Sequence, residues 1–277
     1  IMYAFIQYVN QLFNPLIDVM QNYSVLQTSM VAAERVFEIM DRTDYEPDQA
    51  NLDLQIQDGI IEFKHVSFSY DGKRDILQDI SFSVKKGQTI AFVGSTGSGK
   101  SSIINLFLRF YEFERGQILI DGRDIKDYSQ AELRRKIGLV LQDPFLYHGS
   151  IASNIQLYQE QLTREEIIEA AKFVDAHGFI SQLPQGYDSP VTERGATFSS
   201  GQRQLLAFAR TIATKPKILI LDEATANIDS ETEELIQASL RKMRRGRTTI
   251  AIAHRLSTIQ DADCIYVLDK GRIIESG

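Results

Sequence analysis

The sequence has one cysteine, only four histidines and fewer basic residues than acidic ones. The single cysteine, Cys264, cannot form an internal disulfide, so a reduced, cytosolic setting is expected. The net charge of −7 at pH 7 argues against a nucleic-acid partner, because proteins that bind nucleic acid usually present a basic face. The sequence shows no recognisable secretory signal, internal repeat or low-complexity tract.

The first seventeen residues contain no charged side chain. Their apolar side chains would surround a helix on most sides, over a length slightly short of the roughly 20 residues that span a bilayer. We expect the cytosolic end of a transmembrane helix whose beginning lies upstream, so that the chain is a fragment of something longer. The alternative is an amphipathic helix buried in a soluble protein. The helical pattern continues to Met40, and a charged linker containing Pro47 follows. The predicted domains are therefore 1–41 for this helix, 42–59 for the linker and 60–277 for the remainder.

A complete phosphate loop follows the apolar run 90–93. It reads Gly94-Ser95-Thr96-Gly97-Ser98-Gly99-Lys100-Ser101 and matches G-x-x-x-x-G-K-[ST]. The glycines allow a tight turn whose N–H groups point at phosphate, and the helix that begins near Lys100 adds its positive dipole end. Lys100 would bind the β- and γ-phosphates, Ser101 would bind Mg²⁺ and Ser102 would reach the α-phosphate. The motif predicts nucleoside triphosphate binding but does not specify the reaction.

Two carboxylates end a second buried run, in Ile218-Leu219-Ile220-Leu221-Asp222-Glu223. Asp222 would hold the Mg²⁺ shell, and Glu223 would orient and deprotonate the water that attacks the γ-phosphate. This pair indicates hydrolysis of the nucleotide.

Hydrophobic periodicity predicts the fold around these motifs. Alternating runs at 61–63, 66–70 and 80–84 indicate an antiparallel sheet, with a bulge near His65 where the phase slips. Continuous apolar runs at 90–93, 218–221, 249–253 and 265–268 indicate parallel strands buried on both faces. Capping boxes predict helix starts at Ser129, Thr163 and Ser230. The segment 144–199 is expected to be mostly helical, as an inserted helical subdomain at about 143–200. We therefore predict an α/β fold with a P-loop NTPase (RecA-like) core, a mostly parallel sheet, an antiparallel β subdomain, this helical subdomain and an N-terminal transmembrane-helix stub.

Between the two catalytic motifs lies a third, Phe198-Ser199-Ser200-Gly201-Gln202. In this order the motifs resemble those of the ABC-type ATPases, in which two ATPs are buried between two nucleotide-binding domains. The resemblance runs from about Ile60 to the chain end. It implies that Ser199 and the following amides form an anion site for the γ-phosphate of the opposite subunit's ATP.

The resemblance also assigns roles to four residues outside these motifs. His254 would be the γ-phosphate switch histidine, and Gln142 would be the Q-loop glutamine that contacts Mg²⁺ and water. Tyr70 would stack on adenine, with a core tyrosine as the alternative, and Asp229 would lie in the D-loop. Ala226 departs from the family's usual serine, which puts communication between the sites in doubt. The other histidines, His65, His148 and His177, are interpreted as surface or packing residues.

The third motif departs from its commonest form, Leu-Ser-Gly-Gly-Gln, at Phe198 and Ser200. The change is either tolerated drift or the mark of a heterodimer in which one composite site has lost part of its chemistry. Thr192-Glu193-Arg194-Gly195 resembles a loop of exporters that touches the membrane domain. The resemblance is closest to one subunit of a bacterial heterodimeric multidrug ABC exporter.

The resemblance therefore implies an ATPase with ATP and Mg²⁺ as ligands. It implies a second, non-identical ABC subunit and the chain's own transmembrane domain as partners, and no nucleic acid. The expected place is the cell membrane, with the nucleotide-binding domain on the cytoplasmic side, and the expected cargo is an amphiphilic compound. The alternatives are a non-transport ABC ATPase of the chromosome-maintenance or repair type and a P-loop kinase.

Overall fold

A computed structural model describes residues 2–42, 55–157, 159, 161–192, 195–222, 230–253 and 259–277, with residues 230 and 231 described by their backbone alone. The chain divides into two compact units, residues 1–48 and 49–277. Three predicted site residues, Glu223, Asp229 and His254, lie outside the described residues.

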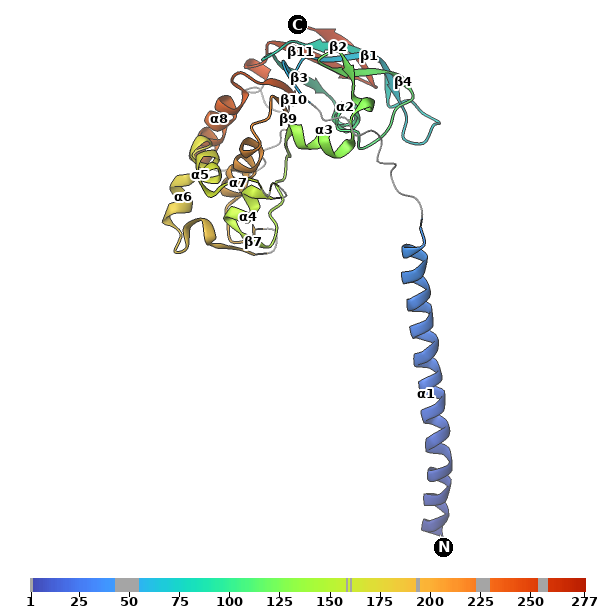
Figure 1. The fold of residues 1–277 in the computed structure, drawn as a ribbon. Helices are drawn as coiled ribbons and strands as arrows, with labels where there is room; N and C mark the ends of the chain where they lie inside the picture. Colours follow the sequence, from blue (N-terminus) through green and yellow to red (C-terminus); the bar gives the residue numbers. More distant parts are fainter. Residues whose placement is uncertain are drawn as a thin grey trace. The chain divides into compact units, whose positions relative to one another are not determined.

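The first unit is a single helix, α1 (Met2–Met40), drawn in blue in Figure 1. It contains Pro15 and buries none of its side chains. The predicted helix to Met40 is confirmed. Among the described residues, no helix combines the length and the apolarity needed to cross a membrane. This finding does not support the transmembrane stub expected for residues 1–41.

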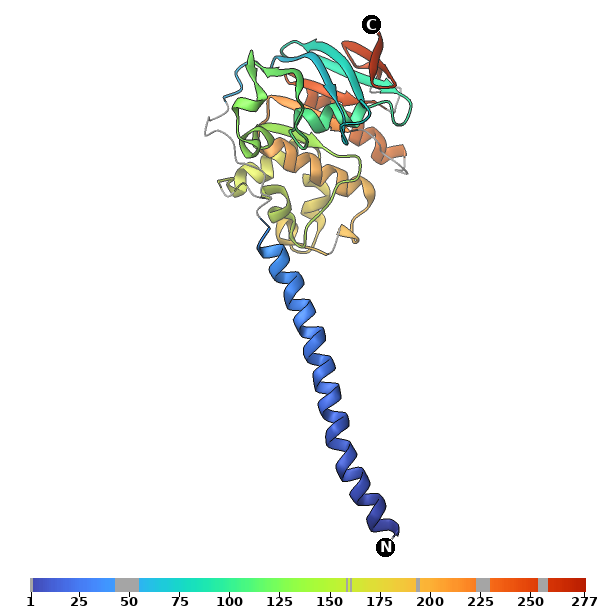
Figure 2. The same ribbon diagram turned by 90° about the vertical axis from the view of Figure 1, so that its right-hand side faces the viewer.

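The second unit is built on a six-stranded sheet with the order β12-β11-β3-β10-β9-β6. Its strands are β3 (Thr89–Gly94), β6 (Ile137–Val140), β9 (Ile218–Asp222), β10 (Thr248–Ile252), β11 (Cys264–Asp269) and β12 (Arg272–Ser276). The five strands from β11 to β6 pair in parallel, and β12 pairs antiparallel with β11. The four continuous apolar runs are all strands of this sheet, as predicted, but β11 is mostly half-buried and not buried on both faces. Figure 2 shows the same unit from a second side.

An antiparallel sheet with the order β2-β1-β4-β5 forms the second layer. It contains β1 (Ile61–Phe68), β2 (Leu77–Val84), β4 (Arg115–Ile120) and β5 (Arg123–Asp124). The predicted bulge is confirmed, because the register of β1 on β2 shifts between Phe63 and Val66 and His65 has a φ of 52°. Both sheets share one core, which also takes in α2 (Lys100–Phe107) and α3 (Gln130–Lys136). The turn η1 (Ile125–Asp127) precedes α3.

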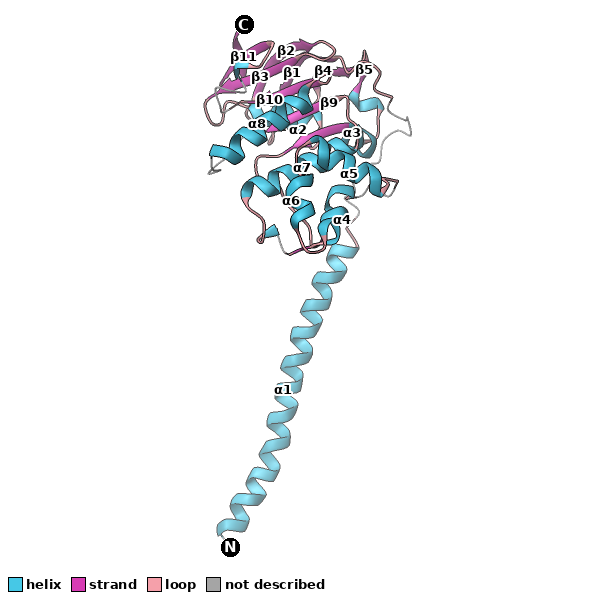
Figure 3. Ribbon diagram, turned by 90° about the vertical axis from the view of Figure 1, so that its left-hand side faces the viewer, coloured by secondary structure: helices cyan, strands magenta, loops and turns pink. Residues whose placement is uncertain are grey.

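The remaining helices gather on one side of the parallel sheet, as Figure 3 shows in cyan. They are α4 (Ile151–Gln156), α5 (Arg164–Phe173), α6 (His177–Gln182), α7 (Ser200–Ala213) and α8 (Ser230–Arg244), with η2 (Gly186–Asp188). They enclose a second core. Capping side chains at Ser129 and Thr163 start α3 and α5, as predicted. The expectation that 144–199 is mostly helical is only partly met, because α4, α5 and α6 are short and β7 (Gly149–Ser150) pairs with β8 (Pro190–Val191).

Candidate functional site

The phosphate loop joins β3 to α2, so that it lies at the carboxyl end of a central parallel strand. Its glycines at 94, 97 and 99 have φ angles of 153°, 81° and 108°. A Cβ on Gly94 would lie 2.2 Å from the Leu268 carbonyl oxygen, and one on Gly99 would lie 2.7 Å from Leu77 Cδ2. Gly97 has open space around it, so its φ alone requires glycine. The sequence prediction for this loop is met in its backbone conformation.

Hydrogen bonds hold the Lys100 side chain against the phosphate loop. Its ammonium group donates to the carbonyl oxygens of Gly94 at 2.8 Å and Ser95 at 2.9 Å. The side chain is buried, which lowers the pKa of Lys100, while the negative charge of Asp222 acts in the opposite direction. The lysine of the phosphate loop and the carboxylate at the end of β9 therefore belong to one electrostatic site.

The turn between β11 and β12 braces the phosphate loop, which the sequence analysis did not foresee. The Gly271 amide donates to the Ser98 carbonyl at 2.9 Å, and the Gly271 carbonyl accepts from the Gln78 amide at 2.8 Å. A Cβ on Gly271 would lie 2.1 Å from the Ile76 carbonyl oxygen. The Ser98 hydroxyl beneath the loop is buried and has no hydrogen-bond partner in the structure. The only sequence signal for this support is the Lys270-Gly271 turn between two apolar strands.

Gln142 and Asp222 follow neighbouring strands. Asp222 ends β9, Gln142 follows β6 by two residues, and these strands pair in parallel. Because the carboxyl ends of parallel strands meet at one edge of the sheet, the two residues are at the same edge as the phosphate loop. Among the described residues, no group of three His, Cys, Asp or Glu side chains could hold a metal ion. The hydroxyl of Ser101, the amide oxygen of Gln142 and the Asp222 carboxylate still suit Mg²⁺, which takes few protein ligands besides substrate phosphates and water.

Tyr70 lies beside α2 and is 48% exposed, so the alternative of a core tyrosine is not met. Its hydroxyl lies 3.0 Å from the Ser102 hydroxyl on the first turn of α2. The structure therefore brings the predicted adenine contact to the predicted α-phosphate contact. Phosphate oxygens only accept hydrogen bonds, so a Ser102 hydroxyl that donates to phosphate can still accept from Tyr70.

The motif at 198–202 forms the start of α7. The Ser199 hydroxyl accepts from the Gln202 amide at 3.1 Å, and the Gln202 side chain accepts from the Ser199 amide at 3.0 Å. This capping box uses two amides of the helix start and leaves those of Ser200 and Gly201 for an anion. Phe198 is buried in the second core, so its side chain serves packing and does not face a ligand.

Gly201 is the glycine of this motif that packing requires. A Cβ there would lie 2.1 Å from Thr232 Cγ2 on α8. Ser200, where the motif departs from its commonest form, occupies the first helical position of α7. Two of the three histidines interpreted as surface or packing residues also have protein partners, since His65 contacts Asp79 at 2.7 Å and His177 contacts the Tyr187 hydroxyl at 2.8 Å.

The chain is similar to known proteins over the region that contains the fold and the motifs described above. The family model described as "ABC transporter" matches residues 77–226. The chain is 71% identical, over its whole length and 47% of the other protein, to exp8 of Streptococcus pneumoniae serotype 4, which is provisionally described as an ABC transporter ATP-binding protein. It is 44% identical to a fatty acid ABC transporter ATP-binding/permease protein of Mycobacterium bovis, over 99% of this chain and 43% of that protein.

A solved structure shows the same likeness in three dimensions. The structure of a bacterial Atm1-family ABC exporter with ATP bound superposes with a TM-score of 0.78 and 41% identity, over 98% of this chain and 47% of the other. The chain spans about half the length of these relatives. These matches agree with the site, which combines a phosphate loop, a carboxylate at the end of β9 and a capped start of α7. The chain belongs to the ABC transporter family and contains the family's ATP-binding domain.

Proposed function

We propose that this chain is the ATP-binding and ATP-hydrolysing part of an ABC exporter subunit. The observation that most supports the proposal is the phosphate loop between β3 and α2, with Lys100 buried in the field of Asp222. The motif, its backbone conformation and the Asp222 carboxylate at the same edge of the sheet all serve one triphosphate. The likeness to an exporter with ATP bound supports the same function.

Each described residue has a distinct task in this proposal. The loop amides and the start of α2 bind the β-phosphate, and Lys100 exchanges its two carbonyl partners for phosphate oxygens. Tyr70 offers an exposed aromatic face for the base. Ser101, Gln142 and Asp222 would hold Mg²⁺, which neutralises phosphate charge when bound. Glu223 would orient and deprotonate the attacking water, with His254 at the γ-phosphate.

The substitution Glu223→Gln tests the hydrolytic role. ATP binding should persist because the phosphate loop and Tyr70 are intact, whereas turnover should fall by the ~10²–10⁴-fold typical of losing a general base. ATP affinity and phosphate release measure the two effects. Lys100→Ala serves as the comparison, since it should weaken binding and hydrolysis together. Full-rate hydrolysis by Glu223→Gln would contradict the assignment.

The partner assignments extend the same proposal. The chain would act with its own transmembrane domain in the cell membrane, with the ATP-binding domain on the cytoplasmic side. Similar proteins include some named as fatty acid and multidrug transporters, which supports an amphiphilic cargo. The second ABC subunit would be non-identical, because the phosphate-loop side of this chain keeps its expected residues while its α7 motif is altered at Phe198 and Ser200.

A further inference from the structure

Three aromatic rings meet beside the phosphate-loop helix α2. The ring of Tyr70 lies edge-to-face with those of Phe68 and Tyr111, with both pairs of centroids 4.7 Å apart. Phe68 and Tyr111 are themselves 6.0 Å apart, so the rings form a triangle. Phe68 is buried, whereas Tyr111 is 47% exposed, almost as much as Tyr70. Tyr70 is therefore supported by one ring from the core and one from the surface.

The hydroxyl of Tyr70 is anchored as well as its ring. It lies 3.0 Å from the Ser102 hydroxyl, and the side-chain amide of Asn105 donates to it at 3.4 Å. Both partners are on α2, directly after the phosphate loop. A ring fixed at its hydroxyl can still swing about that point, and the two neighbouring rings limit this motion.

The position of Tyr111 is set by the way α2 ends. The Arg109 amide donates to the Leu106 carbonyl at 3.0 Å, and the Phe110 amide donates to the Asn105 carbonyl at 2.8 Å. These two bonds make a Schellman motif, in which the residue after the helix adopts a left-handed conformation. Arg109 occupies that position with a φ of 50°, where glycine is usual. Unlike glycine, an arginine at this position provides a side chain that can make polar contacts.

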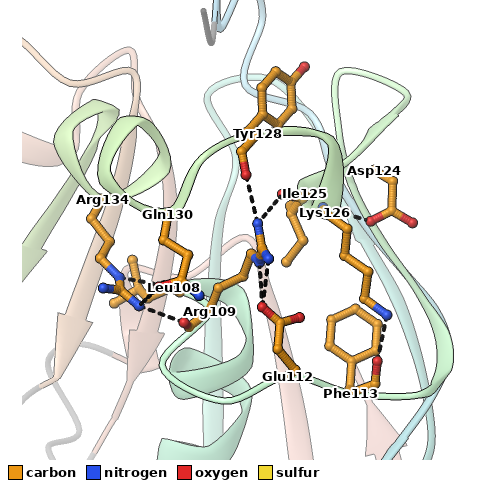
Figure 4. A network of polar contacts seen from close by, with 10 residues as sticks. All are labelled: Leu108, Arg109, Glu112, Phe113, Asp124, Ile125, Lys126, Tyr128, Gln130 and Arg134. Carbon is orange, nitrogen blue, oxygen red and sulfur yellow. Dashed lines mark hydrogen bonds and ion pairs between the residues drawn. The ribbon is translucent and has the colours of Figure 1, made fainter. Parts of the chain in front are cut away.

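The Arg109 side chain fastens the segment that carries Tyr111 (Figure 4). It is only 2% exposed, and it donates to the Glu112 carboxylate at 2.9 and 2.6 Å and to the Tyr128 carbonyl at 2.6 Å. A longer bond reaches the Ile125 carbonyl. From the other side, Arg134 donates to the Arg109 carbonyl at 2.6 Å. Hydrogen bonds thus connect the residues on both sides of Tyr111 to η1 and α3, so the backbone that carries its exposed ring is held in place.

We propose that Tyr111 is a positioning residue for the nucleotide base, which acts by holding Tyr70 in the orientation that stacks on adenine. The inference rests on the proposed function. The described ring contacts of Tyr111 are with Tyr70 and Phe68, neither of which belongs to the phosphate loop. The loss of Tyr111 should therefore affect ligands that carry a base and spare ligands that do not.

The test compares ATP with inorganic tripolyphosphate, by calorimetric titration into the full chain. Tyr111→Ala should weaken ATP binding by about 2- to 12-fold, the range that an aromatic pair contributes beyond its buried area, and leave tripolyphosphate affinity unchanged. Tyr111→Phe should restore ATP affinity, because it keeps the ring. In a Tyr70→Ala background, Tyr111→Ala should have no further effect.

Phe110 provides a matched control on the neighbouring position. It is 44% exposed, and its ring packs under the Arg134 guanidinium at 4.7 Å. Phe110→Ala should leave ATP affinity unchanged. Far-UV circular dichroism shows whether each variant is folded, and Tyr111→Leu replaces Tyr111→Ala if that variant does not fold.

Two results would overturn the inference. One is an unchanged ATP affinity in Tyr111→Ala, or in Tyr111→Leu where that variant replaces it, and the other is an equal loss of affinity for ATP and tripolyphosphate in a folded variant. A wild-type chain that binds neither ligand would instead overturn the proposed function, so the two failures are distinguishable.

Discussion

Lys100 is the residue whose environment most directly reports its task. An ammonium group in a buried site carries a desolvation penalty, which lowers its pKa, and the charge of Asp222 offsets only part of this effect. A bound triphosphate adds several negative charges and should raise the same pKa. The buried positive charge of Lys100 therefore destabilises the free protein, although the same charge binds the triphosphate.

A pH dependence of ATP binding follows from this shift. The free protein loses the Lys100 proton at a pH below the ordinary value of 10.5, whereas the complex keeps it. Affinity should be level near neutral pH and then fall, by up to about tenfold per pH unit, as pH rises through the lowered pKa. Measuring Kd from neutral pH to the alkaline range checks this. Lys100→Met should bind weakly with a flat profile, and a flat profile in the wild type would contradict the assignment.

The sequence predicted the residues of the phosphate loop because the motif is contiguous and its chemistry is local. Tyr111 and Gly271 escaped prediction for the opposite reason. Tyr111 reaches Tyr70 across some 40 positions of sequence, and Gly271 reaches Ser98 from the far end of the domain. Neither contact leaves a pattern in the surrounding residues, so only the fold reveals it.

At the scale of elements, α7 and α8 pack closely beside the motif at 198–202. Gly201 allows this packing, because a Cβ at that position would overlap Thr232 Cγ2. The start of α7 is therefore packed closely against α8, the first described helix after Asp222.

Gly201→Ala should lower the stability of the nucleotide-free protein by about 1–3 kcal/mol, the usual cost of overpacking. The cost should largely disappear in combination with Thr232→Ser, which removes the overlapping methyl group and keeps the hydroxyl. Denaturant unfolding of the wild type, both single variants and the double variant measures this coupling. Additive effects of the two substitutions would show that the contact is not the cause.

Continuous and alternating apolar runs predicted six of the twelve described strands, β1, β2, β3, β9, β10 and β11. Burial on one face leaves an alternating pattern, and burial on both faces leaves an unbroken apolar run. The helical subdomain was predicted less well. Its two-residue strands β7 and β8 are too short to show any period, and α4 and α6 have six residues each. Such elements are defined by their tertiary contacts rather than by local pattern.

At the scale of the whole molecule, the phosphate-loop side of this chain keeps its expected residues, whereas its α7 motif is altered. In the ABC dimer that the family resemblance implies, each ATP would lie between one subunit's phosphate loop and the other's α7 motif. In a heterodimer, Glu223 of this chain would act with an intact partner motif, and Ser200 would serve the weaker site. Because Ser200 offers a backbone amide at the helix start just as glycine would, its effect should be small.

Ser200→Gly should therefore change the turnover of the assembled transporter only modestly, whereas Glu223→Gln should nearly abolish it. Steady-state ATP hydrolysis of the complete complex compares the two. The decisive control is a homodimer of this chain. If it hydrolyses ATP at both sites at full rate, the heterodimer proposal is wrong.

The β11–β12 turn has a consequence for the order in which the domain can be made. The phosphate loop lies near the start of the domain, but its brace at Gly271 lies close to the last described residues. A chain emerging from the ribosome must expose the loop's glycines and Lys100 long before Leu268 and Gly271 arrive to shape them. The phosphate-binding site is therefore incomplete until β11 and β12 have been translated, and the ability to bind nucleotide would be acquired only at that point.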